Sequence, residues 1–297
     1  MMYVNEILSV LFDAHVEAAS DVYLLPASDH YRVVVRYPGV LADVQKVPLS
    51  VGKRWINYLK YHAGMNVSEH RRVQQGAWLC PEVGCYLRLS ATGDFQNAES
   101  LVVRLIAPVP ALNAVTQPVV AVLVEILRQR GLMVMTGPTG SGKTTLMYQV
   151  AKVLADCRMV MTIEDPVEIH EPEFLQLQVN AAAGMTYAAL LKAALRHRPD
   201  VVVIGELRDE ETALAACEAA LAGHIVLATL HTRGPLDVPL RMRSLGVPAN
   251  LIDGALRASA QVSLEPGPPV QPRVSLWRWY DGQETAVQVE REDGHGD

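Results

Sequence analysis

Residues 135–150 of the chain read MTGPTGSGKTTLMYQV. Four of them, Gly137, Gly142, Lys143 and Thr144, match the pattern G-x-x-x-x-G-K followed by Ser or Thr. Glycines in this pattern let the backbone turn, so that consecutive N–H groups point inward at phosphate oxygens. Lys143 would neutralise phosphate charge, and the hydroxyl of Thr144 would bind Mg²⁺. The pattern therefore predicts a site for the phosphates of a nucleotide.

The surroundings of this pattern support the prediction. A short apolar run, 131–136, precedes it as a strand, and a helical pattern, 144–156, follows it. The helix points the positive end of its dipole at the same anion, so the order strand, loop, helix is the one that the mechanism requires. The residues expected to contact the nucleotide are Gly137, Pro138, Thr139, Gly140, Ser141, Gly142, Lys143, Thr144 and Thr145.

Strands and helices alternate along the second part of the chain, which we assign to residues 118–297. Strands are predicted at 131–136, 158–163, 201–204 and 224–230, and helices at 144–156, 186–196 and 209–222. The alternation is typical of an α/β fold with a mainly parallel sheet and helices on its faces. After a loop at 265–273, the runs 274–280 and 285–291 are predicted to form a terminal hairpin.

The first part of the chain, 1–106, has a different pattern and is predicted to be a small α+β domain. Helices are expected at its start and at 50–64, where Ser50 would cap the beginning and Gly64 the end. Strand-like runs lie at 21–25, 31–37, 86–91 and 101–106. The proline-rich residues 107–117 are predicted to be a linker.

Two carboxylates stand at the ends of apolar strands: Glu164 and Glu206. Parallel strands would deliver both groups to the edge of the sheet where the phosphate loop lies. One can hold Mg²⁺ together with Thr144, and the other can orient or deprotonate a water molecule in line with the γ-phosphate. An acid after a strand can also mark only the point where the chain emerges into solvent.

Histidines flank the last predicted strand, with His224 before it and His231 after it. A histidine here could bond a γ-phosphate and report its loss, whereas a lone histidine is more often a packing residue. Arg196 begins a basic cluster at a helix end, where cations are also favoured without any function. Both interpretations remain open for these residues.

The charge and composition of the chain limit the classes of partner that it is expected to bind. Half of the 297 residues are apolar, enough for two sizeable cores, and the net charge is −6. This acidity argues against general affinity for nucleic acid or anionic lipid. The four cysteines include no C-x-x-C pair, so no zinc site is predicted. The absence of a signal-peptide or membrane-span pattern predicts a cytosolic protein without a transmembrane segment.

The order of four segments resembles the secretion ATPase superfamily, the motors of type II secretion systems and type IV pili. These segments are GPTGSGKTT, MTIEDPVEI, LRHRPDVVVIGELRD and IVLATLHT. They look like the family's Walker A, Asp box, Walker B and His box. The resemblance implies a RecA-like P-loop ATPase domain that binds ATP and Mg²⁺. More weakly, the first part of the chain resembles the family's PAS-like N-terminal domain.

This resemblance also implies roles for individual residues. Glu164 would activate water, Glu206 would position Mg²⁺, and His231 would face the γ-phosphate. By position, His224 matches the second histidine of the His box and is expected to contact the nucleotide. The resemblance further implies three arginines that stabilise the transferring phosphoryl group: Arg88, Arg104 and Arg196.

The resemblance extends to assembly and partners. Family members form hexameric rings, act at the cytoplasmic face of the cell membrane and push on a polytopic inner-membrane platform protein. The short chain, with LRHRPD and no inserted metal-binding segment, looks most like the competence branch, which assembles the DNA-uptake pilus. No direct contact with nucleic acid is expected.

Two alternatives stay open at this stage. A type IV secretion motor, or another RecA-like ATPase that handles DNA, would share the phosphate loop, because a fold does not fix a function. A nucleotide-controlled regulatory protein would bind ATP without hydrolysing it. Stimulation by single-stranded DNA would favour the first alternative, and binding without phosphate release would favour the second.

Overall fold

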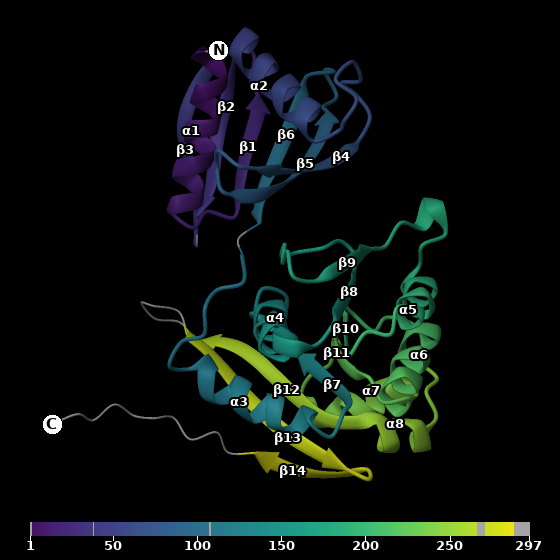
Figure 1. Ribbon diagram of the computed structural model, residues 1–297. Helices are drawn as coiled ribbons and strands as arrows, with labels where there is room; N and C mark the ends of the chain where they lie inside the picture. The colour runs from purple at the N-terminus through teal and green to yellow at the C-terminus, as the bar shows by residue number, and fades with distance from the viewer. Residues whose placement is uncertain (1, 38, 107, 266–270, 288–297) are drawn as a thin grey trace, which may run out of the picture. The chain divides into compact units, whose positions relative to one another are not determined.

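The computed structural model describes residues 2–37, 39–106, 108–265 and 271–287. They divide into two compact units between Pro108 and Val109, which lies inside the predicted linker. Each unit has its own sheet and its own hydrophobic core. Each unit therefore folds around its own core (Figure 1).

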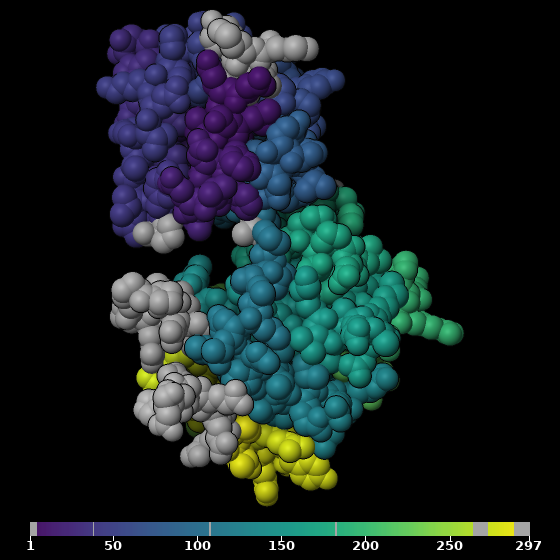
Figure 2. Space-filling model, turned by 60° about the vertical axis from the view of Figure 1, so that its left-hand side comes forward, coloured from purple at the N-terminus to yellow at the C-terminus, as the bar shows by residue number. Residues whose placement is uncertain are grey.

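The first unit is a six-stranded antiparallel sheet in the order β3-β2-β1-β6-β5-β4, with two helices. Its elements are α1 (Met2–Val16), β1 (Asp21–Pro26), β2 (His30–Tyr37), β3 (Val40–Pro48), α2 (Leu49–His62), β4 (Gln74–Cys80), β5 (Cys85–Gly93) and β6 (Glu99–Ile106). Alternate residues of β5 and β6 are buried and pack with both helices in one core. The outer side of α1 lies on the surface of this unit (purple in Figure 2).

The second unit is an eight-stranded sheet in the order β14-β13-β12-β7-β11-β10-β8-β9. Neighbouring strands from β12 to β9 are parallel, and the terminal pairs β12–β13 and β13–β14 are antiparallel. Its strands are β7 (Gly131–Thr136), β8 (Val160–Glu164), β9 (Leu175–Gln178), β10 (Val201–Ile204), β11 (Ile225–Thr229), β12 (Leu256–Glu265), β13 (Gln271–Tyr280) and β14 (Gln283–Val287). The predicted mainly parallel α/β sheet is confirmed.

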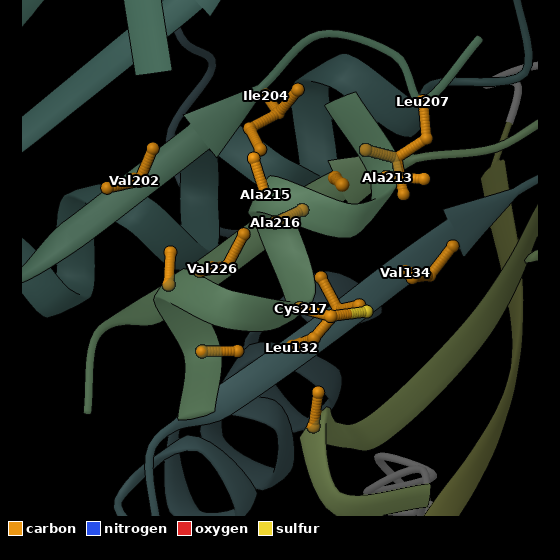
Figure 3. Packing of buried hydrophobic residues seen from close by; sticks show 14 of the residues in the cluster. Leu132, Val134, Val202, Ile204, Leu207, Ala213, Ala215, Ala216, Cys217 and Val226 are labelled. Carbon is orange, nitrogen blue, oxygen red and sulfur yellow. The ribbon is translucent and has the colours of Figure 1, made fainter. Parts of the chain in front are cut away.

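Helices cover both faces of this sheet (Figure 1). They are α3 (Thr116–Leu127), α4 (Lys143–Leu154), α5 (Tyr187–Arg196), α6 (Glu210–Leu221), α7 (Val238–Ser244) and α8 (Ala249–Ala255). One core joins α3 and α4 to the sheet, and the other joins the remaining helices. Small residues of α6, including Ala213, Ala216 and Cys217, let that helix lie close to the strand residues Leu132 and Val226 (Figure 3).

Side chains cap the beginnings of two of the predicted helices. Asp209 caps α6, since its side chain accepts a hydrogen bond from the backbone of Thr212. Thr186 caps α5 in the same way. The prediction that Ser50 caps α2 is wrong, because the helix begins at Leu49 after Pro48 and no side chain caps it. Proline fixes the backbone angle φ and so can lead a chain into a helix without a hydroxyl cap.

The sequence patterns missed four strands: β3, β4, β9 and β12. Strand β3 is exposed along most of its length, so the alternation of apolar and polar residues that marks a half-buried strand is weak there. The predicted loop at 265–273 is also wrong at both ends, because Glu265 belongs to β12 and Gln271 begins β13. The terminal hairpin is confirmed as β13–β14 up to Val287, and its last predicted residues lie outside the described ones.

The parallel strands give the second unit two distinct edges. We call the edge where β7, β8, β10 and β11 end the carboxyl edge, and the edge where they begin the amino edge. In parallel sheets, ligands bind outside the carboxyl ends of the strands. None of the helices in the described ranges is both long and apolar enough to cross a lipid bilayer.

Candidate functional site

The predicted phosphate loop joins β7 to α4 at the carboxyl edge. Its backbone uses the region that favours glycine, with φ of +136° at Gly137 and +91° at Gly142. A Cβ atom added at Gly137 would lie 2.3 Å from the carbonyl oxygen of Val262 and 2.8 Å from Ser141 Oγ. No larger residue fits at Gly137 unless β12 moves, so the tight turn depends on this glycine.

Polar groups in this loop are arranged for an anion. Lys143 Nζ donates to the carbonyl oxygens of Gly137 (2.9 Å) and Pro138 (2.7 Å). Burial lowers the pKa of Lys143, while two nearby carboxylates oppose the shift. Ser141 Oγ is buried without a hydrogen-bond partner among the described residues. A phosphate would give both side chains a charged partner, so the loop fits a polyphosphate.

A pocket of about 520 Å³ opens over this loop. This volume lies within the range of small-molecule sites in proteins. Besides the loop, the pocket is lined by polar residues from three strand ends: Glu164, Glu168, Glu206, Arg208, Thr229 and His231. The structure therefore brings the loop together with Glu164, Glu206 and His231.

Glu206 and His231 face each other across neighbouring strand ends. Glu206 Oε1 lies 3.4 Å from His231 Nε2, and Glu206 Oε2 accepts a hydrogen bond of 2.5 Å from Arg208 Nε. Arg208 Nη1 also lies 3.6 Å from the carboxylate of Asp165. Arg208 thus links the acids that follow β8 and β10 into one charged group at the pocket. The sequence motifs do not single out Arg208, although it stands two residues after Glu206.

Glu164 reaches the pocket wall, but its carboxylate is already engaged. Its side chain is buried, and Oε1 accepts hydrogen bonds from the hydroxyls of Tyr148 and Thr162, the latter at 2.7 Å. Oε2 lies 3.5 Å from the backbone nitrogen of Glu168. Burial raises the pKa of Glu164, and the hydrogen bonds that it accepts counteract this effect. The water-activating role that the resemblance implies for Glu164 stays a prediction.

Glu168 is a functional candidate that the sequence motifs did not predict. Its side chain is exposed at the pocket, and its Oε2 accepts a hydrogen bond of 2.8 Å from the hydroxyl of Thr144. It therefore contacts the residue predicted to bind Mg²⁺. A signal was available, because the segment IEDPVE places a second glutamate four residues after Glu164.

The carboxyl-edge oxygens suit Mg²⁺. No group of three or more His, Cys, Asp or Glu side chains that could hold a metal occurs among the residues described. Nucleotide-bound Mg²⁺, however, needs only one or two protein oxygens, because phosphates and water supply the rest. The hydroxyl of Thr144 and the carboxylates of Glu168 and Glu206 line the same pocket, and hard oxygen donors are those that Mg²⁺ prefers.

The structure does not bring His224 and Arg196 to this pocket, which corrects their predicted place within one chain. His224 precedes β11, whereas His231 follows it, and His224 Nδ1 lies 2.7 Å from the carbonyl oxygen of Pro199. Arg196 ends α5, whose first residue, Tyr187, lines the pocket. Ten helical residues span about 15 Å, so α5 carries Arg196 away toward the amino edge.

Arg88 and Arg104 belong to the first unit. They are register partners on β5 and β6, and Arg104 Nε lies 2.8 Å from Asp21 Oδ1. Arg104 is thus paired with an acid of its own unit. A contribution of these two arginines to a nucleotide site stays a prediction.

Comparison with known proteins decides the family. The sequence matches the family of type II/IV secretion system proteins over residues 2–263. The chain belongs to this family. Three of its relatives span most of the chain and illustrate which machines this type II/IV secretion system protein resembles.

Two of these relatives are competence proteins. ComGA of Streptococcus pneumoniae is 40% identical over 240 residues, which cover 80% of this chain and 77% of that protein. ComGA of Bacillus subtilis is 34% identical over 261 residues, or 85% of this chain and 73% of that protein. The type IV pilus assembly ATPase PilB of Acinetobacter baylyi is 36% identical over 82% of this chain but only 43% of PilB.

Solved structures share the fold. The ATPase DotB of Legionella pneumophila gives a TM-score of 0.73 at 24% identity, covering 92% of this chain and 80% of DotB. The pilus retraction motor PilT with bound ADP gives a TM-score of 0.71 at 25% identity, covering 91% and 81%. These findings confirm the predicted resemblance and fold class, and the predicted function class agrees with the relatives.

Proposed function

We propose that this secretion-family protein hydrolyses ATP to power the assembly of a type IV pilus-like or type II secretion-like filament. The observation that carries the proposal is the meeting of Lys143, Thr144, Glu168, Glu206 and His231 at the carboxyl edge. This combination provides an anion cradle, hard oxygen donors and a carboxylate beside one pocket. Names of relatives that include the word ATPase support the same chemistry.

In the proposed complex, the triphosphate lies along the loop from Gly137 to Thr145. Backbone N–H groups and Lys143 Nζ bind the β- and γ-phosphates, so Lys143 leaves the carbonyl oxygens that it now contacts. Thr144 and Glu206 would hold Mg²⁺, and the ion would supply a positive charge that polarises the phosphate oxygens. Ser141 Oγ gains a hydrogen-bond partner.

We assign the work on water to Glu168 rather than to Glu164. Hydrolysis needs a carboxylate that accepts a proton as the water oxygen attacks the γ-phosphorus and the bond to the bridging oxygen of ADP breaks. Glu168 faces the pocket beside Thr144, whereas both oxygens of Glu164 are turned to neighbouring donors. Glu164 keeps a supporting role under this assignment.

His231 and Glu206 provide a way to register the γ-phosphate. The imidazole of His231 is half exposed and contacts Glu206 at 3.4 Å, so it can move from the carboxylate to a phosphate oxygen. Departure of the phosphate would return it to Glu206. This exchange would connect hydrolysis to the ends of β10 and β11.

Membership of the family supports a proposal for the wider assembly. We expect a homo-hexamer that works in the cytoplasm at the inner face of the cell membrane, against a polytopic platform protein. The competence proteins among the relatives favour the DNA-uptake pilus over a DNA-handling or type IV secretion motor. Arginines expected from other subunits, such as Arg196, would act between chains.

Phosphate release from ATP by the purified chain tests the proposal. We expect Mg²⁺-dependent turnover that Glu168→Gln lowers about 100-fold, since a general base contributes roughly 10²–10⁴-fold. ATP binding should persist in that variant. Binding without any turnover by the wild-type oligomer would instead support the regulatory-protein alternative, and strong stimulation by single-stranded DNA would support the DNA-handling one.

A further inference from the structure

Tyr187 lines the pocket but has no part in the reaction described so far. It is the first residue of α5, directly after the cap Thr186, and it packs in the core that joins α5 and α6 to the sheet. The residue is only 9% exposed, and the exposed part belongs to the pocket over the phosphate loop. The core therefore holds the ring in place, and the hydroxyl is the group that could meet a bound molecule.

The hydroxyl of Tyr187 lies where β8 and β10 end. Gly205, the residue after β10, is level with Glu164, the last residue of β8, and its N–H donates to the carbonyl oxygen of Ile163 at 2.8 Å. A Cβ atom added at Gly205 would lie 3.0 Å from Tyr187 Oη and 3.4 Å from the Cα atom of Glu164. The hydroxyl thus faces the gap between the strand ends that carry Glu164 and Glu206.

The glycine at position 205 gives the hydroxyl this room. Its φ lies outside the left-handed region, so other residues could adopt the same backbone conformation. A methyl group there would come closer to Tyr187 Oη than a comfortable van der Waals contact. The lack of a side chain at Gly205 therefore serves the approach of the hydroxyl rather than a turn of the chain.

This hydroxyl is close to charged groups but bonded to none of them. Burial raises the pKa of Tyr187 to about 12, so the hydroxyl stays protonated at neutral pH. Four charged residues lie near enough to act on the same pKa: Arg208, Asp165, Glu164 and Glu206. Within the described ranges, however, Oη makes no hydrogen bond. A largely buried hydroxyl without a partner calls for an explanation, and its capacity to donate and to accept is free for a bound molecule.

In-line hydrolysis creates a need for such a group. The attacking water must direct one O–H bond at a carboxylate, which takes the proton as the water oxygen bonds to phosphorus. Its second O–H bond needs an acceptor that fixes the orientation of the water without removing the proton. A neutral tyrosine hydroxyl is an acceptor of this kind, because it already carries its own proton.

We propose that the hydroxyl of Tyr187 binds and orients the water molecule that attacks the γ-phosphate. The water donates one hydrogen bond to Tyr187 Oη, and its other proton passes to a carboxylate of the pocket. The oxygen–phosphorus bond forms as the bond from phosphorus to the bridging oxygen of ADP breaks, and Tyr187 keeps its charge throughout. The inference rests on the proposed function, and it holds whichever carboxylate takes the proton.

Tyr187→Phe is the first test, because it removes the hydroxyl and keeps the buried ring. We expect kcat for ATP to fall about tenfold and KM to change less than about twofold, since the water is misplaced while ATP still binds. The hydroxyl has no hydrogen bond to lose within its unit, so the melting temperature should stay within about 2 °C of the wild-type value.

Tyr31→Phe is the matched control for this variant. Tyr31 is a buried tyrosine of the first unit, and its hydroxyl donates to the carbonyl oxygen of Glu99 at 2.8 Å. Removing it breaks a hydrogen bond, so this variant should lose more stability than Tyr187→Phe and keep the wild-type kcat. The pair therefore separates a hydroxyl that serves the reaction from one that serves the fold.

Gly205→Ala tests the geometry independently, and it carries the test if Tyr187→Phe does not fold. Its methyl group would displace the hydroxyl of Tyr187, so kcat should fall about three- to tenfold with KM again little changed. In a Tyr187→Phe background the methyl group meets no hydroxyl. The double variant should therefore turn over within about twofold of Tyr187→Phe alone.

Several results would overturn the inference. They are an unchanged kcat in Tyr187→Phe or Gly205→Ala, a melting temperature of Tyr187→Phe lowered as far as that of Tyr31→Phe, and an equal loss from Gly205→Ala in both backgrounds. A rise in KM that accounts for the whole loss of activity would also do so, because the hydroxyl would then bind ATP instead of water. Wild-type protein that binds ATP and releases no phosphate would instead overturn the proposed function.

Discussion

The two edges of the second unit's sheet are built from the same strands yet gather different residues. At the carboxyl edge, a loop and three strand ends place Lys143, Glu206 and His231 around one pocket. At the amino edge, Arg196 is exposed and His224 bonds a backbone carbonyl oxygen. Convergence in space therefore distinguishes a site from a set of residues that merely resemble one.

The largest expected effect at the carboxyl edge comes from Lys143→Ala. Lys143 would bind two phosphates through charge-assisted hydrogen bonds, each contributing about 1.5–3 kcal/mol. We expect the affinity for ATP to fall at least about 100-fold. Titration with a fluorescent ATP analogue measures it, and an unchanged affinity would remove the loop from the binding site.

A pair of histidine variants compares the edges directly. His231→Ala should lower kcat about tenfold, because one hydrogen bond to the γ-phosphate is lost, worth roughly 1.5 kcal/mol. His224→Ala should leave kcat within about twofold when both proteins have the same oligomeric state. The comparison fails if His224→Ala proves as damaging as His231→Ala.

Glu164→Gln should change how stability depends on pH. Burial raises the folded-state pKa of Glu164 above its usual 4.5, so the folded protein binds this proton more tightly than the unfolded one. Glu164 therefore costs stability as pH rises from about 4.5 through the raised folded value. Denaturant unfolding should therefore show that the free energy of unfolding of the variant rises relative to that of the wild type as pH increases above about 4.5. A constant difference would mean that Glu164 titrates normally.

The smallest effect is expected from Arg196→Ala. This exposed residue lies at the end of α5 that is remote from the pocket. Affinity for ATP, measured on the monomeric chain by the same titration, should stay within about twofold of the wild type. A tenfold loss in the monomer would bring Arg196 into the site of its own chain.

Local chemistry made much of this edge predictable. The glycines and Lys143 form a continuous pattern, and Glu206 follows an apolar run directly, so each position depends on a few neighbours. The sheet followed from the alternation of strands and helices. Strands β3 and β12 could not be predicted in this way. Their place in the sheets depends on the strands with which they pair, and these strands are distant in sequence or give only a weak pattern.

The errors at the site have two physical causes. The seven residue-to-residue steps from His224 to His231 span about 23 Å when extended, so the two histidines cannot share one edge of the sheet. This distance follows from the length of the predicted strand alone. The family motif, however, groups both histidines in one box and so suggested that they lie together. Glu168 was missed for another reason: the path of the chain after Glu164 depends on contacts with α4 and β9 that are distant in sequence.

Cleavage of bound ATP in a single turnover tests the central claim most directly. Wild-type protein, Glu168→Gln and the control Glu173→Gln, an exposed acid of the same segment, would be saturated with γ-labelled ATP. We expect all three to bind ATP, with Glu168→Gln releasing labelled phosphate about 100-fold more slowly than the other two. Release by Glu168→Gln at the wild-type rate would contradict the account.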